Sequence, residues 1–62
     1  MDKEEITKRR EALGISKSAL AREAGLHVST VSQIELGRLV PYQAQLDKIE
    51  DALRRLETLQ VI

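Results

Sequence analysis

Two short helical segments separated by a glycine-centred turn constrain this chain more than any other feature. Ser16 is a good helix N-cap, and residues 17–24 run without a breaker to Gly25. Beyond that glycine an apolar pattern resumes over about 28–36 and stops at Gly37. Two helices this short, joined by so tight a turn, meet at a steep angle, as in a helix-turn-helix. An ordinary helical corner without a ligand is the alternative that the spacing leaves open.

Two further segments complete an expected all-α chain of four helices. Residues 2–13 contain no breaker, Asp2 and Glu5 have the spacing of a capping box, and Gly14 follows as a C-terminal cap would. From residue 42 or 43 onward no Gly or Pro interrupts the chain. Apolar residues recur there in steps typical of a helix at Leu46, Ile49, Leu53 and Leu56. We predict a long fourth helix whose last turn frays or becomes extended.

Segment 28–36 is rich in β-branched residues, which leaves a strand as the alternative. These residues are Val28, Thr30, Val31 and Ile34. Strict alternation of apolar and polar residues is absent, and the polar residues fall on one helical face. The pattern therefore favours a helix.

The stretch from Leu13 to Gly37, LGISKSALAREAGLHVSTVSQIELG, followed by Pro41, resembles a known family. It is similar to the Xre or lambda-repressor-like helix-turn-helix domain of phage repressors and Cro proteins, and the resemblance covers about residues 6–53. It implies a compact bundle in which segment 28–36 is the recognition helix that enters the major groove of DNA. We expect one domain over residues 1–62, a lambda-repressor-like bundle of four helices with the fourth extended toward the C-terminus.

Two opposite charges lie on otherwise apolar helix faces. Arg10 lies in a stripe with Ile6 and Leu13, and Glu35 lies beside Ile34. Because an unpaired buried charge is costly, we expect Arg10 and Glu35 to form a structural ion pair. The resembled family usually pairs these positions as well. The alternative is that Arg10 mainly contacts a phosphate.

The polar face of segment 28–36 is the candidate DNA-reading surface. It holds the residues expected to contact bases, Val28, Ser29, Ser32 and Gln33. Gln33 can bond bidentately to adenine, Val28 can pack on a thymine methyl group, and the serines are permissive. A merely solvated polar face is the alternative.

Phosphate contacts are expected around this surface. The candidates are Ser16 and Lys17 at the start of segment 17–24, together with Thr30 and Arg38. Arg22 and the start of the last helix at Tyr42 and Gln43 are weaker candidates, and Lys17 or Arg22 can simply be solvated.

Two residues depart from the family pattern. His27 occupies the N-cap position where Ser or Thr is common, and the chain has no Cys and no second His to share a metal. A capping or phosphate-facing role is therefore expected for His27. Leu36 stands where a polar residue is frequent, which suggests either extra core or a contact with a neighbouring subunit.

The C-terminal segment 54–62 also departs from the family, whose members commonly add a fifth helix. Its apolar residues are Leu56, Leu59, Val61 and Ile62, and little of the core remains to cover them. Such a patch usually marks an interface, so we expect a dimerisation segment that places two recognition helices about 34 Å apart on a pseudo-palindrome. The alternative is that these residues cap the core of their own chain.

Charge and composition narrow the function. Ten Lys and Arg balance ten Asp and Glu, and residues 16–45 hold three basic side chains and two acidic ones. A monomer is therefore expected to have only weak electrostatic attraction to DNA. The sequence predicts a cytoplasmic, sequence-specific DNA-binding regulator, a phage- or plasmid-type repressor that binds double-stranded DNA as a homodimer.

Other classes of function fit the composition less well. No cofactor, metal or small-molecule ligand is expected, and no apolar run approaches the roughly 20 residues of a membrane span. One His and scattered carboxylates do not supply the groups of an enzyme. The alternative function is an antitoxin or protein-bridging module that binds another protein through its apolar C-terminal segment.

Overall fold

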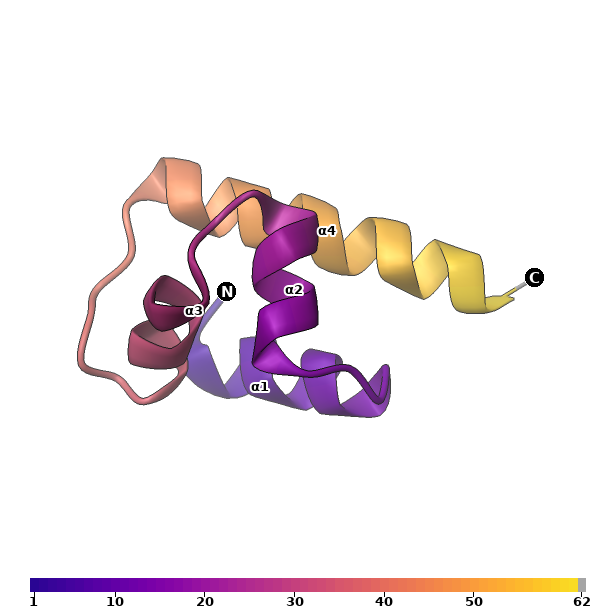
Figure 1. Cartoon of the computed structure of the whole chain (residues 1–62), viewed down its shortest axis with the longest axis horizontal. Coiled ribbons are helices and arrows are strands. Elements are labelled where there is room, and N and C mark those ends of the chain that lie inside the picture. Colours follow the sequence, from indigo (N-terminus) through magenta and orange to yellow (C-terminus); the bar gives the residue numbers. More distant parts are fainter. Residues whose placement is uncertain (62) are drawn as a thin grey trace.

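The chain folds into four α-helices and connecting turns. The computed structural model describes residues 1–61, with α1 at Lys3–Ala12, α2 at Lys17–Ala24, α3 at Val28–Glu35 and α4 at Gln43–Val61 (Figure 1). The all-α, four-helix prediction is confirmed, and segment 28–36 is a helix rather than a strand. The predicted fraying or extension of the last turn is wrong as far as Val61, which is still helical. Ile62 lies outside the described residues.

Local caps set the turn between α2 and α3. The hydroxyl of Ser16 accepts a hydrogen bond from the Ala19 N–H at 3.0 Å, which satisfies one free donor of the first turn of α2. Gly25 ends α2 in the left-handed conformation at φ 70°, which an L side chain rarely adopts. The Leu26 N–H then bonds back to the Ala21 carbonyl at 2.9 Å, as in a Schellman motif. The direction in which α3 leaves α2 is therefore fixed by backbone geometry.

The core is shared by all four helices. α2 packs against both α3 and α4, and α1 packs against the same two helices. Small side chains at Ala21 and Ala24 are buried on α2, where they let neighbouring helices approach closely. The buried set consists of Ile6, Leu13, Leu20, Ala21, Ala24, Val31, Ile34, Ile49, Ala52 and Leu53. The chain contains no cysteine, so no disulfide is available, and this apolar cluster holds α2 and α3 in place.

The end of α4 reaches beyond the other three helices (Figure 1). Leu56 is half-buried and packs against the core, so the expectation that little of its own chain covers it is wrong. Leu59, one turn further, is 66% exposed. The side chain of Val61 and all of Ile62 lie outside the described residues. The alternative, that tail residues cap their own core, therefore holds for Leu56.

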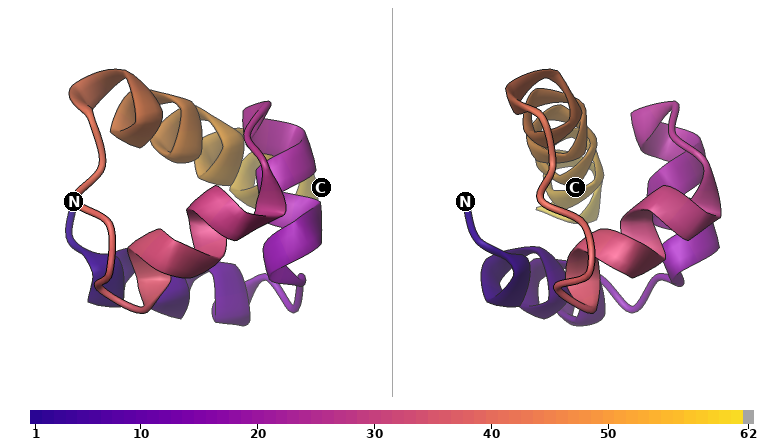
Figure 2. Two further views of the ribbon diagram at one scale, coloured as in Figure 1. Left: turned by 60° about the vertical axis from the view of Figure 1, so that its left-hand side comes forward. Right: turned by 90° about the vertical axis from the view of Figure 1, so that its left-hand side faces the viewer.

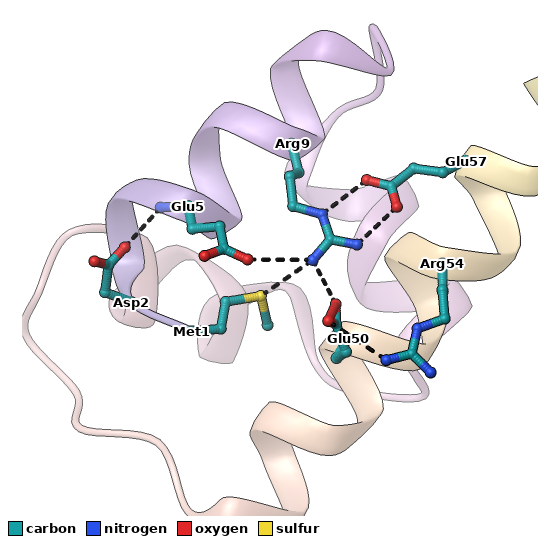
Figure 3. Close-up of polar contacts among 7 residues, drawn as sticks. All are labelled: Met1, Asp2, Glu5, Arg9, Glu50, Arg54 and Glu57. Atoms are coloured by element: carbon teal, nitrogen blue, oxygen red, sulfur yellow. Dashed lines mark hydrogen bonds and ion pairs between the residues drawn. The ribbon is translucent and has the colours of Figure 1, made fainter.

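Charged side chains fasten this part of α4 to α1 (Figure 3). Arg9 donates two hydrogen bonds to the Glu57 carboxylate, from Nε at 2.8 Å and from a terminal nitrogen at 2.7 Å. Its other terminal nitrogen bonds to Glu50 and lies 3.4 Å from a Glu5 oxygen. The hydrogen bonds from Arg9 hold the pKa of Glu57 below its usual value. Arg9 thus joins α1 to two successive parts of α4, a contact the sequence analysis did not anticipate.

Two more polar contacts hold the last turns of α4. The Gln60 side-chain amide donates to the Leu13 carbonyl at 3.1 Å, just after α1 ends. Arg55 donates to the carboxylate of Glu23 at 3.0 Å and to its backbone carbonyl at 2.8 Å, at the end of α2.

Within residues 1–61, no helix has both the length and the apolar composition needed to cross a bilayer.

Candidate nucleic-acid interface

The recognition helix predicted from the sequence, α3, has one buried face and one open face. Val31 and Ile34 are 0% and 2% exposed, and they fix the inner face against the core. Val28 and Ser29 are exposed at the start of the helix, and no other helix lies in front of α3 in the right-hand view of Figure 2. Ser32 and Gln33 are half-exposed further along. All four residues expected to contact bases are therefore accessible on α3.

An ion pair holds the end of α3 to α1. Arg10 donates to both oxygens of the Glu35 carboxylate, at 2.8 Å from Nε and 3.0 Å from a terminal nitrogen. Thr7 adds a hydroxyl hydrogen bond to Glu35 at 3.0 Å, and the remaining Arg10 nitrogen bonds to the Ile15 carbonyl at 2.9 Å. The side chains of Arg10 and Glu35 are only 11% and 3% exposed. The Glu35 carboxylate raises the pKa of Arg10, and all three guanidinium nitrogens of Arg10 are hydrogen-bonded within the chain.

His27 caps the start of α3. Its Nδ1 atom accepts a hydrogen bond from the Ser29 backbone N–H at 3.1 Å and lies 2.8 Å from the Ser29 hydroxyl oxygen. The imidazole thus accepts the backbone N–H that a Ser or Thr hydroxyl usually accepts at an N-cap. Its capping role is the one that the sequence analysis favoured over metal binding.

The residues proposed to contact phosphates come from three parts of the chain. Ser16 is exposed and Lys17 half-exposed at the start of α2, where free backbone N–H groups attract an anion. Thr30 is half-exposed on α3. Arg38 is exposed in the loop after α3, and its N–H bonds to the Gln33 carbonyl at 2.9 Å. The structure therefore brings Arg38 next to Gln33, while Ser16 and Lys17 belong to the neighbouring helix.

An apolar surface in the α3–α4 connection was largely missed by the sequence analysis. Its four exposed residues, here called the loop patch, are Leu36, Leu39, Val40 and Tyr42. Leu36 is 52% exposed, so the suggestion that it adds to the core is wrong. The run of apolar residues before and after Pro41, in a segment without helical pattern, was the available signal.

Comparison with known proteins assigns the family. A family model described as helix-turn-helix matches residues 6–59, which spans α1, the α2–α3 unit and most of α4. Comparisons with curated proteins and with solved structures gave no significant match. The match agrees with the steep α2–α3 turn at Gly25 and with the resemblance noted in the sequence. The chain therefore belongs to the Xre and lambda-repressor-like family of DNA-binding helix-turn-helix domains.

Proposed function

We propose that this DNA-binding domain is a transcriptional repressor of the phage or plasmid type, acting in the cytoplasm by occupying a pseudo-palindromic operator as a homodimer. The observation that carries the proposal is the construction of α3. Its inner face is buried through Val31 and Ile34, its last residue is tied to Arg10, and its outer face stays open. A helix held in this way presents the same side chains to the major groove at every encounter.

The proposed base contacts follow from the chemistry of that open face. Gln33 offers an amide that can bond to both N6 and N7 of adenine, and Val28 offers methyl groups to a thymine methyl. Ser29 and Ser32 supply hydroxyl contacts. Backbone phosphates are held by Ser16, Lys17, Thr30 and Arg38, which set the register without reading the sequence.

A second copy of the chain is part of the proposal. Residues 16–45 carry only one more basic than acidic side chain, which gives a single copy little electrostatic attraction to DNA. We place the dimer contact at the projecting end of α4, through Leu59, Val61 and Ile62, with Leu56 at its inner edge. The exposure of Leu59 supports this placement. A two-fold dimer then matches the symmetry of a pseudo-palindrome.

An antitoxin or protein-bridging module is the second candidate. It is favoured by the amount of exposed apolar surface, since Leu59 and the loop patch are both accessible on one small domain. In that case the exposed surface binds a different protein, and DNA binding depends on the complex.

One experiment separates the two candidates. Sedimentation equilibrium over a concentration series measures self-association, and selection from a random-sequence duplex pool measures DNA preference. The repressor predicts a dimer that enriches two half-sites about one helical turn apart. A monomer that enriches no sequence contradicts the repressor and favours the bridging module.

A further inference from the structure

The contact between His27 and Ser29 fixes the position of a hydrogen atom. Nδ1 of His27 accepts the Ser29 backbone N–H at 3.1 Å. A ring nitrogen that accepts an N–H carries no hydrogen of its own, so in this contact the ring hydrogen lies on Nε2. The same Nδ1 lies 2.8 Å from the Ser29 hydroxyl oxygen. With no hydrogen on Nδ1, the Ser29 hydroxyl must be the donor in that contact.

This arrangement changes what Ser29 can recognise. A free serine hydroxyl both donates and accepts, which makes it permissive toward base edges. Once its hydrogen is directed to His27, only its lone pairs remain for a partner in the groove. In the major groove, adenine N6 and cytosine N4 are donors, whereas guanine O6 and N7 and thymine O4 are acceptors.

We propose that His27 is a positioning residue that holds Ser29 as an acceptor, so that the DNA base facing Ser29 is an amino base, adenine or cytosine, rather than guanine or thymine. The inference rests on the proposed function, because it requires Ser29 to face a base edge. The inference goes beyond the proposed function by assigning a class of base to one position of each half-site.

The surroundings of Ser29 support a fixed orientation. Ser29 is the second residue of α3, at the end of a recognition helix that enters the groove most deeply, and it is exposed. The helix cannot rotate easily about its axis, because Val31, two residues after Ser29, is fully buried and Glu35 is bonded to Arg10 at the far end. The cap bond to the Ser29 N–H ties His27 to the same residue whose hydroxyl it orients.

The first test concerns the free protein. Nitrogen NMR of the imidazole distinguishes a ring hydrogen on Nε2 from one on Nδ1. We expect the hydrogen on Nε2 at neutral pH. A hydrogen on Nδ1 overturns the proposal, because the hydroxyl of Ser29 would then be the acceptor from His27 and free to donate to DNA.

The second test concerns base preference. Duplex selection is repeated with the wild-type chain, with Ser29→Ala, and with His27→Ser, which keeps a side chain favoured at an N-cap. We expect the wild type to prefer adenine or cytosine over guanine or thymine about fivefold at one position per half-site, the size of one net hydrogen bond. Both variants lose that preference and keep the preferences at the other positions. Ser32→Ala is the matched comparison: it removes a hydroxyl from α3 that does not contact His27, so any change it causes should fall at another position and leave the preference at the Ser29 position intact.

The outcomes separate this inference from the proposed function. An operator enriched without an amino-base preference at any position that Ser29→Ala alters overturns the inference and leaves the repressor standing. The same holds if His27→Ser retains the full preference, because the imidazole is then not what orients the hydroxyl. Enrichment of no sequence by any form contradicts the repressor, and the base assignment with it. Melting temperatures of the variants show that α3 is still folded in each case.

Discussion

Arg10 and Glu35 form a two-point ion pair that joins the last turn of α1 to the last residue of α3. Both side chains are almost completely covered, and Thr7 and the Ile15 carbonyl satisfy further hydrogen-bonding positions of the pair. Removing one partner leaves the other charge buried, which is far more costly than the pair itself is favourable. The tilt of α3 against the core therefore depends on this contact as well as on apolar packing.

Arg10→Met is expected to lower the free energy of unfolding by about 3 kcal/mol, because the Glu35 carboxylate is left buried without its partner. The double variant Arg10→Met with Glu35→Leu is expected to recover most of the loss, since it buries no charge. Thermal and urea unfolding followed by circular dichroism measure both. Wild-type stability in the single variant would show that the pair does not stabilise the fold.

Gln33→Ala is expected to relax base preference at one position of each half-site, by about 1–3 kcal/mol of discrimination, because a bidentate contact to adenine is lost. Arg38→Ala is the matched control. It should weaken binding to all sequences alike and reduce the salt slope by about one, as loss of a phosphate contact does. Titration of a set of single-base operator variants at several salt concentrations checks both. An equal loss on every duplex with Gln33→Ala would remove it from the base-reading set.

Glu57 makes the stability of the fold sensitive to acid. Its pKa is lowered in the folded chain by the hydrogen bonds from Arg9, so its contribution is present above the unfolded pKa and is lost as the pH falls through the folded value. With Glu57→Gln, the free energy of unfolding is therefore expected to decrease less steeply as the pH falls below about 4.3, the ordinary pKa of a Glu. Because its side chain is 38% exposed, the difference at neutral pH stays below about 1 kcal/mol.

Unfolding measured across this acidic range compares Glu57→Gln with the wild type and with Glu4→Gln, an exposed carboxylate outside the Arg9 cluster. Glu4→Gln should follow the wild-type curve more closely. Superimposable curves for Glu57→Gln and the wild type would mean that the bond to Arg9 adds nothing in solution.

Leu59→Asp is expected to weaken self-association at least about tenfold, since it places a charge in the proposed dimer contact, while the melting temperature stays close to that of the wild type. Leu56→Asp is expected to lower the melting temperature too, because Leu56 packs on the core. Ala44→Asp adds the same charge at an exposed position near the other end of α4 and should change neither. Sedimentation equilibrium measures the association, and an unaltered dimer with Leu59→Asp would move the contact elsewhere.

Local chemistry made much of this fold predictable from the sequence. The limits of α2 follow from Ser16 and Gly25, whose effects act within one turn of the helix. The ion pair was also predictable, because Arg10 and Glu35 are charges on faces that are otherwise apolar. A buried charge in such a position requires a partner of opposite sign, and the facing apolar stripe supplies it.

Contacts between distant polar faces could not be predicted in the same way. Arg9 and Glu57 are 48 positions apart and lie on faces that resemble any solvated helix surface. Their pairing depends on how far α4 extends along α1, and local sequence patterns do not predict that alignment. The burial of Leu56 has the same origin. The orientation of the Ser29 hydroxyl required the geometry of the His27 ring, since sequence shows only that a His precedes the helix.

The last turns of α4 differ from the rest of the fold in what holds them. Beyond Leu56, the described side chains attach them through Glu57 and Gln60, with Arg55 one residue before, and none of the apolar side chains described there is fully buried. Amide hydrogens there should exchange through frequent local opening, whereas those of α3 should exchange only in larger unfolding events. In the proposed dimer, the spacing between the two recognition helices then depends on these weakly held turns. A dimer contact of this kind would let the dimer bind operators whose half-sites differ slightly in separation or twist.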